Sequence, residues 1–398
     1  MTILSDRINS LSESATLMMT KLGRELTAKG INVISLSIGE PDFGTPEHVK
    51  EAAKKALDEN WTRYSPVPGY PELRQAIVNK LKKENNLDYD ISQIVVSTGA
   101  KQSLSNVILT LVNPGEEVII PTPYWVSYSE MVVLAQGKSV YIDTTIESDF
   151  KITPAQLEAA ITPKTKLFMF SSPCNPTGSV YSREELAGLV AVFEKYPNIH
   201  ILSDEIYEHI NFVDKHVSIA EFPSVKERVI IVNGFSKAFA MTGWRLGYIA
   251  ASKEIAAAND KMQGQTTSGT SSISQRAGIA AYEQGLETVL EMKKAFARRR
   301  ELVYNLLNDI PGVKTNLPDG AFYFFPEISS FFGKKDAEGN VINNSADLAL
   351  YLLNVGHVAT VGGDSFGNNN YIRISYAASD ESLVEALKRI KEALAKLS

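Results

Sequence analysis

Arg228-Val-Ile-Ile-Val-Asn-Gly-Phe-Ser-Lys237 is the stretch from which the architecture of this chain can be worked out. Its apolar first half lacks alternation of polar and apolar residues, which is typical of a strand buried on both faces of a parallel sheet. Lys237 comes just after this strand, where burial lowers the pKa of an amine and leaves it partly neutral. A neutral amine can attack a carbonyl group and form an imine. The alternative is an ordinary solvated lysine in a loop.

Other short apolar runs between about residues 90 and 250 resemble this strand and alternate with helical stretches. Ser182 followed by Glu185 forms a capping box, which marks the start of one such helix. The pattern predicts an α/β fold, in which a mainly parallel seven-stranded sheet is flanked by helices. The predicted strands are Ile94–Ser97, Val118–Pro121, Ser139–Ile142, Lys166–Phe170, Ile199–Leu202, Val229–Val232 and Gly247–Ala250.

The character of the sequence changes near residue 285. A long charged helix is expected from Glu287 to about Asp309, strands at 320–325 and 371–375, and a last helix from about Glu381 to Lys396. These elements predict a smaller α+β domain, which the N-terminal arm joins because it cannot bury a core alone. The expected division is 1–45 for the arm and part of the small domain, 46–285 for the large cofactor-binding domain and 286–398 for the small domain.

Composition excludes several classes of partner. The chain has 398 residues, 44% of them hydrophobic, and a net charge of −6, which argues against nucleic acid or an anionic membrane as a partner. Cys174 is the single cysteine, so an internal disulfide cannot form, as is typical of a reducing compartment. No apolar signal core or membrane-spanning run is visible. We therefore expect a cytoplasmic protein that acts on small molecules.

Polar residues follow the predicted strands where ligands of parallel sheets bind. Ser236 and Arg245 flank Lys237 and suit a phosphate, so the three together suggest a phosphate-bearing aldehyde such as pyridoxal 5'-phosphate. Asp204 can pair with a protonated pyridine nitrogen, although a helix N-cap is an equally ordinary role for it. Tyr207 lies one helical turn further on, or is a core tyrosine.

Further candidates have similar alternatives. Asn175, in a tight Pro- and Gly-bearing loop, can donate to a ring oxygen or only stabilise the turn. Gly99 opens a helix whose free N–H groups suit a phosphate. Trp125 can stack on an aromatic ring or pack in the core. Arg373 lies in an apolar strand, where it either binds a substrate carboxylate or forms a structural salt bridge.

With these motifs the chain resembles the class I aminotransferases of the pyridoxal-phosphate fold type I superfamily, and more narrowly the aspartate aminotransferases of the prokaryotic branch. The resemblance covers nearly the whole chain. It is carried by Ser37-Ile-Gly-Glu-Pro-Asp-Phe43, Tyr64-Ser-Pro-Val-Pro-Gly69, Pro123-Tyr-Trp-Val-Ser-Tyr128, Asn175-Pro-Thr-Gly178, Ser203-Asp-Glu-Ile-Tyr-Glu208 and Ser236-Lys-Ala-Phe-Ala-Met-Thr-Gly-Trp-Arg245.

The resemblance implies a homodimer with shared active sites and a ping-pong transamination between L-aspartate and 2-oxoglutarate. It implies that Lys237 holds the cofactor as an internal aldimine, that Asp204 pairs with the pyridine nitrogen, and that Tyr64 reaches the phosphate of the partner subunit. The other implied cofactor contacts are Gly99, Ala100, Lys101, Trp125, Asn175, Tyr207, Ser236 and Arg245, and the implied substrate contacts are Gly39, Trp125, Asn175 and Arg373.

The sequence leaves more than one substrate open. The 261–268 region lacks the arginine with which animal-type aspartate enzymes bind the distal carboxylate, so we expect Lys101, with Thr16 of the N-terminal arm, to serve instead. Prephenate, aromatic amino acids or alanine as substrates remain open, as does a lyase reaction on the same scaffold.

Rivals from other classes have weaker support. A cofactor-sensing regulator would carry a DNA-binding helix-turn-helix before the Gly39 motif, and a dehydrogenase would show a Gly-x-Gly-x-x-Gly turn after an early strand; neither is seen. Glu208 and His209 hint at metal ligands but have no further ligand at suitable spacing, so no metal is expected.

Overall fold

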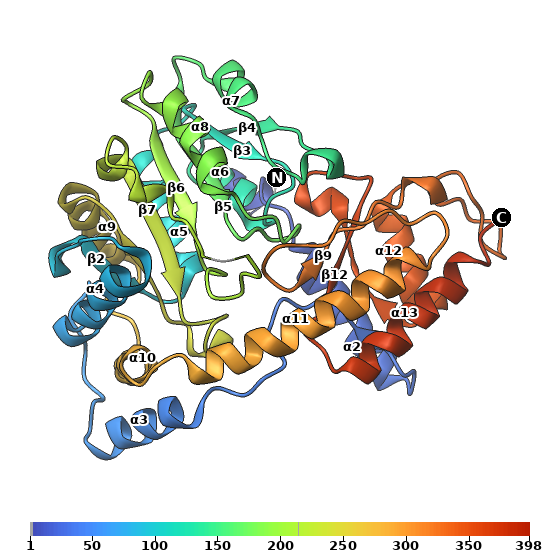
Figure 1. The fold of residues 1–398 in the computed structure, drawn as a ribbon, viewed down its shortest axis with the longest axis horizontal. Helices are drawn as coiled ribbons and strands as arrows, with labels where there is room; N and C mark the ends of the chain where they lie inside the picture. Colours follow the sequence, from blue (N-terminus) through green and yellow to red (C-terminus); the bar gives the residue numbers. More distant parts are fainter. Residues whose placement is uncertain (1–2, 214) are drawn as a thin grey trace.

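The computed structural model describes residues 3–213 and 215–398, and a seven-stranded sheet forms its centre (Figure 1). The strand order is β2-β8-β7-β6-β5-β3-β4, and all strands are parallel except β8, which runs antiparallel to both neighbours. The prediction of a mainly parallel seven-stranded sheet is confirmed. The strands are β2 (Ile94–Ser97), β3 (Glu117–Pro121), β4 (Lys138–Ile142), β5 (Thr165–Ser171), β6 (His200–Asp204), β7 (Val229–Gly234) and β8 (Gly247–Ala250).

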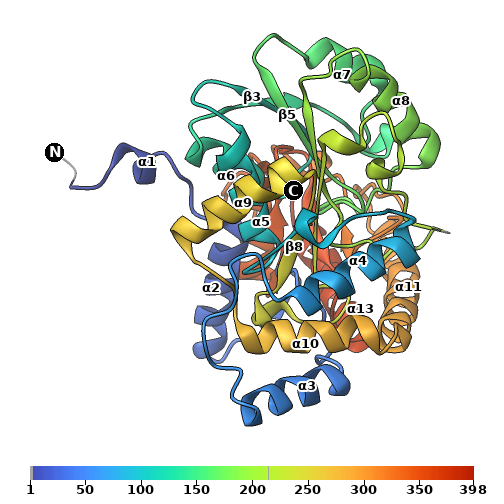
Figure 2. The same cartoon turned by 90° about the vertical axis from the view of Figure 1, so that its left-hand side faces the viewer.

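Helices cover both faces of the sheet (Figures 1 and 2). Successive residues of a strand point to opposite faces, so strands that are apolar throughout need cover on both sides. Val96 and Phe168 pack into one apolar cluster, whereas their neighbours Val95 and Met169 pack into another on the opposite face. The first cluster includes residues of α4 (Pro71–Asn85), α8 (Arg183–Phe193) and α10 (Ser272–Glu283). The second includes residues of α5 (Ala100–Leu111), α6 (Ser127–Leu134) and α9 (Lys253–Thr266). Helices α3 (Glu47–Asp58) and α7 (Pro154–Ala160) complete this part.

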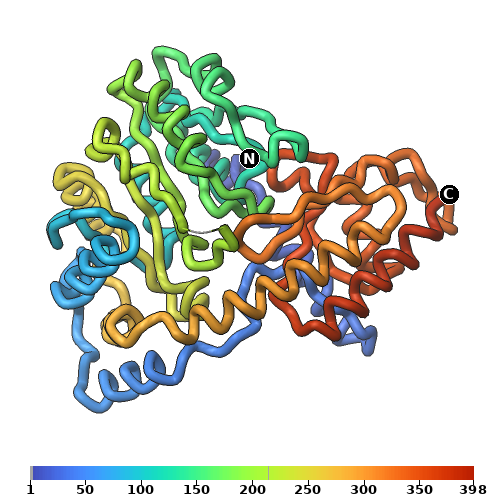
Figure 3. Tube along the Cα trace, in the orientation of Figure 1, coloured from blue at the N-terminus to red at the C-terminus, as the bar shows by residue number. Residues whose placement is uncertain are grey.

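The C-terminal part lies at the other end of the long helix α11 (Glu287–Asn308), as the trace in Figure 3 shows. It contains a three-stranded antiparallel sheet in the order β11-β12-β9. Its elements are β9 (Tyr323–Phe324), α12 (Ser345–Val355), β10 (Val358–Ala359), β11 (Val361–Gly362), β12 (Ile372–Ser375) and α13 (Asp380–Leu394).

The N-terminal segment packs against this C-terminal part. Strand β1 (Ile34–Ser35) pairs in parallel with β10, and Met19 of α2 (Ala15–Ala28) packs against Leu353. The short α1 (Asp6–Asn9) projects away from the rest of the chain (Figure 2). The division into segments 1–45, 46–285 and 286–398 stays a prediction. Among the described residues, no helix combines the length and apolar character needed to cross a membrane.

Candidate active site

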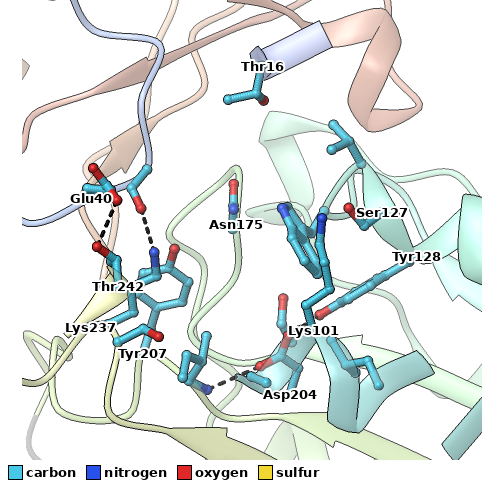
Figure 4. A pocket seen from close by; sticks show the side chains of 18 of the residues that line it. Thr16, Glu40, Lys101, Ser127, Tyr128, Asn175, Asp204, Tyr207, Lys237 and Thr242 are labelled. Carbon is cyan, nitrogen blue, oxygen red and sulfur yellow. Dashed lines mark hydrogen bonds between the residues drawn. The ribbon is translucent and has the colours of Figure 1, made fainter. Parts of the chain in front are cut away.

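A cavity of about 350 Å³ lies beyond the carboxyl ends of the central strands, where it meets the N-terminal segment and the C-terminal part (Figure 4). Parallel sheets bind their ligands at this end. The structure brings most of the sequence-predicted residues together in the lining of the cavity. These are Thr16, Gly39, Ala100, Lys101, Trp125, Asn175, Asp204, Tyr207, Ser236, Lys237, Arg245 and Arg373.

Lys237 points into the cavity from the turn that follows β7. Its Nζ donates a hydrogen bond of 2.5 Å to the carbonyl oxygen of Gly39 and lies 5.6 Å from the ring centre of Tyr207. Burial lowers the pKa of Lys237 to about 8, and the nearby positive charges of Arg373 and Arg245 act in the same direction. The amine therefore loses its proton readily near neutral pH.

Asp204 faces the cavity at the last position of β6 and is 5% exposed. Its Oδ2 accepts a hydrogen bond of 2.7 Å from the Tyr128 hydroxyl, and its Oδ1 accepts one of 3.2 Å from the Ile206 backbone. Burial raises the pKa of Asp204 to about 6, although both hydrogen bonds oppose that rise. A buried carboxylate with so little solvation is a strong partner for a cation placed in the cavity.

Arg373 is almost completely buried, with 2% of its surface exposed. Its Nη1 donates to Oδ1 of Asn175 over 3.0 Å and its Nη2 donates to the Ser37 carbonyl over 2.6 Å. The guanidinium lies 4.7 Å from the Tyr323 ring centre and 4.9 Å from that of Phe366. Its Nε has no hydrogen-bond partner within the described chain. Because a buried donor without a partner is costly, this guanidinium suits an anionic ligand.

A phosphate-sized cradle forms at the N-terminus of α5. Gly99 precedes the helix with φ +83°, and the free N–H groups of the first turn carry the positive end of the helix dipole. A Cβ at Gly99 would lie 2.9 Å from Cζ of Arg245, so the guanidinium packs directly against the glycine. Arg245 itself has φ +55°, an uncommon backbone conformation for a residue other than glycine. Ser236 adds a hydroxyl to the same wall.

Lys101 and Thr16 lie at the outer side of the cavity, away from Lys237 (Figure 4). The Nζ of Lys101 is 4.9 Å from the centre of the Trp125 ring. Partial desolvation, with a contribution from Arg245, lowers the pKa of Lys101. Tyr64, by contrast, is fully exposed and does not line the cavity of its own chain.

Comparison with known proteins decides the family of this chain. Residues 31–390 match the family described as "Aminotransferase class I and II". The chain belongs to this family. A solved aspartate aminotransferase from Rhizobium meliloti superposes with a TM-score of 0.96 at 43% identity, over 100% of both chains. The aspartate aminotransferase from Thermus thermophilus with maleate gives a TM-score of 0.93 at 38% identity, over 99% of this chain and 100% of that one.

Relatives of this aminotransferase have similar names. A "Bifunctional aspartate aminotransferase and glutamate/aspartate-prephenate aminotransferase" from Petunia hybrida is 48% identical over 98% of this chain and 82% of its own length. A "Probable aspartate/prephenate aminotransferase" from Rhizobium leguminosarum is 46% identical over 98% of both chains.

The cofactor of this aminotransferase family is pyridoxal 5'-phosphate, and the cavity fits it. One wall presents the Lys237 amine for an aldehyde, and another presents the Asp204 carboxylate for a pyridinium nitrogen. The α5 N-terminus with Arg245 suits the phosphate, and Trp125 offers an aromatic face. The aldehyde, the ring nitrogen, the phosphate and the aromatic ring of the cofactor thus each find a suitable group at this cavity.

Two tyrosines of the aminotransferase site were not predicted from the sequence. Tyr128 donates to Asp204, and the Tyr323 hydroxyl is 2.7 Å from that of Tyr207. A Cβ added to Gly39 would collide with the Tyr323 hydroxyl, so a glycine is needed there. The spacing of Tyr128 three residues after Trp125 was an available signal, since one helical turn brings the two onto one side. Nothing local marked Tyr323.

Proposed function

We propose that this aminotransferase transfers the amino group of L-aspartate to 2-oxoglutarate, with Lys237 as the residue that binds the cofactor covalently. The observation that carries the proposal is the placement of Lys237, Asp204 and Arg373 around one cavity, with an amine of lowered pKa facing a buried carboxylate and a buried guanidinium. The names of relatives that are 46–48% identical support aspartate as the donor.

Each residue around the cofactor has a proposed task. Lys237 Nζ bonds to the aldehyde carbon, and the Asp204 carboxylate pairs with the protonated ring nitrogen. Asn175 and Tyr207 donate to the ring hydroxyl, and Trp125 stacks on the ring. The proposed phosphate contacts are Gly99, Ala100, Lys101, Ser236 and Arg245, with Tyr64 of the partner subunit.

The proton is moved by Lys237. When bound, the cofactor accepts the donor's amino group and withdraws electrons from its Cα–H bond. With its amine free, Lys237 Nζ would take the Cα proton of the donor as general base, and a pKa of about 8 suits that task near neutral pH. In the second half-reaction Lys237 would return a proton to Cα of the acceptor as general acid. The same side chain serves both half-reactions, so ping-pong kinetics are expected.

Arg373 fixes the substrate for this proton transfer. Its guanidinium is held by Asn175 and Ser37 between two aromatic rings, so it is oriented before the substrate arrives. We assign it the α-carboxylate of the donor, with Gly39 and Asn175 beside it. The resulting alignment keeps the Cα–H bond facing Lys237.

Lys101 and Thr16 are proposed to bind the distal carboxylate of aspartate. Both line the cavity on the side away from Lys237, and Lys101 supplies the positive charge there. Loss of the Lys101 charge is expected to lower kcat/KM about 10-fold or more further for aspartate than for a substrate without a distal carboxylate. Unchanged ratios of aspartate to tyrosine turnover in Lys101→Ala would contradict this assignment.

Prephenate is the second candidate for the amino acceptor. The observation in its favour is that relatives from Petunia hybrida and Rhizobium leguminosarum carry prephenate in their names. Prephenate also has a carboxylate distant from its oxo-acid group, which Lys101 suits equally well. Aromatic amino acids and alanine remain weaker alternatives. A panel of amino donors with 2-oxoglutarate and prephenate as acceptors separates these substrates.

We also propose a homodimer with shared active sites in the cytoplasm. The fully exposed Tyr64 supports the dimer. In a single chain this large side chain has no contact with the cavity, whereas in the proposed dimer it reaches the phosphate in the partner subunit. The single cysteine, Cys174, supports a reducing compartment.

Absorbance of the purified holoprotein tests the proposed function. Aspartate added alone is expected to convert the bound cofactor to its aminated form, with loss of the band given by its bond to Lys237. Addition of 2-oxoglutarate is expected to restore the band and release glutamate. A spectrum that aspartate leaves unchanged, while another donor converts it, would contradict aspartate as substrate.

A further inference from the structure

A buried charged cluster lies behind the cavity, on the far side of the segments that carry the cofactor residues. Its centre is Glu208, whose carboxylate accepts hydrogen bonds from the ammonium of Lys80, from the amide of Asn85 over 2.8 Å and from the amide of Asn233 over 2.6 Å. All four residues are at most 7% exposed, and none of them lines the cavity. Because the network is so deeply buried, leaving any one of its members unpaired would be costly.

The turn that carries Asp204 and Tyr207 has a second face. Asp204 and Tyr207 point into the cavity, whereas Glu205 and Glu208 are directed to the buried cluster. Glu205 is held there as well, because its Oε1 accepts from the hydroxyls of Ser203 and Ser218. The carboxylates of Glu205 and Glu208 therefore hold one face of the turn by hydrogen bonds, while Asp204 and Tyr207 on its other face line the cavity.

Asn233 links this turn to the segment that carries Lys237. It lies near the end of β7, four residues before Lys237, and its own Oδ1 accepts a hydrogen bond of 2.7 Å from the Gly234 backbone. Its amide donates to Glu208, one residue after Tyr207. This hydrogen bond adds a side-chain link to the backbone pairing of β6 with β7, which ends where the Glu205 N–H donates to the Val232 carbonyl over 2.8 Å. The link lies beyond that pairing, between the two chain segments whose side chains must meet on one ligand.

Ionisation of Glu208 favours this arrangement. Although burial raises it, the charges of Lys80, His209 and His216 hold the pKa of Glu208 well below its usual range. The carboxyl group is thus an anion with strong acceptor capacity across the working pH range. Glu205, Glu208 and His216 also bring potential ligand atoms within 4.8 Å of one another. Because the Lys80 ammonium already binds Glu208, a metal ion there would lie against a fixed positive charge.

We propose that Glu208 and Asn233 are positioning residues for the transamination, and that they set the distance between Lys237 and the Asp204–Tyr207 turn. This inference rests on the proposed function. Displacement of a reacting group by about 1 Å costs up to about 100-fold in rate, so loss of one such link is expected to lower kcat about 10-fold. KM for aspartate stays near its wild-type value, because the substrate carboxylates are held by other residues.

Asn233→Ala is the direct test, with Asn259→Ala as its matched control. Asn259 is also 1% exposed and its amide also donates to a nearby acceptor, the Ile255 carbonyl at 2.9 Å, but this bond lies within α9 and does not join two segments of the site. Both variants lose one buried amide, so a general loss of stability affects both. The readouts are kcat and KM for aspartate, and the affinity of the apoprotein for pyridoxal 5'-phosphate measured by tryptophan fluorescence.

We expect Asn233→Ala to bind the cofactor about 10-fold more weakly and to lose kcat with little change in KM, while Asn259→Ala keeps both properties. Equal cofactor affinity and equal kcat in wild type and Asn233→Ala would overturn the proposal. If the wild-type protein itself fails to respond to aspartate, the proposed function fails instead, so the two failures are distinguishable.

A second pair of variants separates a positioning role of the cluster from a role in stability. This pair tests the proposal even if Asn233→Ala does not fold. Glu208→Leu alone removes the shortest ion pair of the buried Lys80 ammonium and leaves it with the Asn85 amide oxygen at 2.8 Å and the Glu84 carboxylate at 3.7 Å, whereas Lys80→Met with Glu208→Leu removes the ion pair and keeps an apolar packing volume. We expect the double variant to regain the melting temperature lost in Glu208→Leu but to keep its low kcat and weak cofactor binding. Recovery of wild-type kcat together with the melting temperature would show that the cluster serves stability alone.

Discussion

At the scale of single residues, burial shifts the pKa values of two opposite charges toward each other. It lowers the pKa of Lys237 to about 8 and raises that of Asp204 to about 6. Between these values Asp204 is ionised and Lys237 needs little free energy to lose its proton. Titratable groups shifted in this way are typical of sites that move protons. Both shifts also destabilise the folded apoprotein, since each charged form is disfavoured by burial.

The cost of burying Lys237 predicts a pH-dependent stability. The pKa of Lys237 is about 8 in the folded chain and 10.5 in the unfolded chain. As pH falls from 10.5 to 8, the unfolded chain therefore binds a proton that the folded chain does not, and the apoprotein loses stability. Below that window the full loss, roughly 3 kcal/mol, remains. Lys237→Met should therefore raise the free energy of unfolding of the apoprotein at pH 7 by up to this amount and give no gain at pH 11. Urea unfolding of both apoproteins at pH 7 and pH 11 measures this difference in the free energy of unfolding. Equal unfolding curves for wild type and Lys237→Met at pH 7 would contradict the cost of burying the Lys237 ammonium.

Removal of Arg373 predicts a selective loss for carboxylate substrates. Arg373→Ala should lower kcat/KM for aspartate about 100-fold or more, because the contact that orients Cα is lost. Arg373→Lys should recover little, since an ammonium cannot reproduce the planar guanidinium that Asn175 and Ser37 hold. The control is Arg183→Ala, which removes a half-exposed arginine that pairs with Glu221 and lies outside the cavity lining. Steady-state kinetics that cannot distinguish Arg373→Ala from this control would refute the role of Arg373.

At the scale of elements, the N-terminus of α5 is the part of the cavity most sensitive to an added methyl group. Gly99 and Gly115 both have φ near +80°, so alanine strains the backbone at either position by about 1 kcal/mol. Only at Gly99 does the new Cβ meet the Arg245 guanidinium; at Gly115 nothing lies within 4 Å. Gly99→Ala should weaken binding of pyridoxal 5'-phosphate about 10-fold or more, and Gly115→Ala should not. Titration of both apoproteins with the cofactor checks this, and matching affinities would show that Arg245 is not part of the cradle.

The strands were the most predictable elements. Each predicted run became a strand of the central sheet with ends shifted by at most two residues. All of these strands except the partly exposed edge strand β4 are buried on both faces, which leaves a continuous apolar pattern in the sequence. Their polar successors were also predictable, since all such residues share one edge of the sheet. The partners of Tyr128 and Tyr323 could not be predicted, because they lie 76 and 116 residues away in the chain. Such contacts depend on tertiary packing, which a local pattern does not encode.

At the scale of the whole molecule, the cavity is assembled from three regions of the chain. Gly39 comes from the N-terminal segment, Lys237 from the end of the central sheet and Arg373 from β12 of the C-terminal part. The N-terminal segment is fastened to the C-terminal part by the β1–β10 pairing and by a bidentate ion pair of Arg299 with Asp42, at 2.7 and 2.8 Å. The packing of these distant segments is therefore a condition for an intact site.

The proposed homodimer makes a prediction about mixed subunits. If Tyr64 serves the partner's site, a hybrid of Tyr64→Ala and Lys237→Ala subunits has one site with both defects and one with neither. Mixing the two weakly active variants and allowing random exchange should restore about a quarter of the wild-type activity, since half the dimers are hybrids with one intact site each. Lys237→Ala mixed with Arg373→Ala serves as the control, because both defects lie in one subunit's own cavity. No restoration in the first mixture beyond that of the control would argue against a shared site.

The covalent bond between the cofactor and Lys237 is tested most directly by borohydride reduction of the holoprotein followed by peptide mass spectrometry. We predict a single pyridoxyl label on the peptide that contains Lys237, and no label in the Lys237→Ala protein. A label on Lys101 or any other lysine of active holoprotein, or active holoprotein without a label, would contradict the assignment of this site.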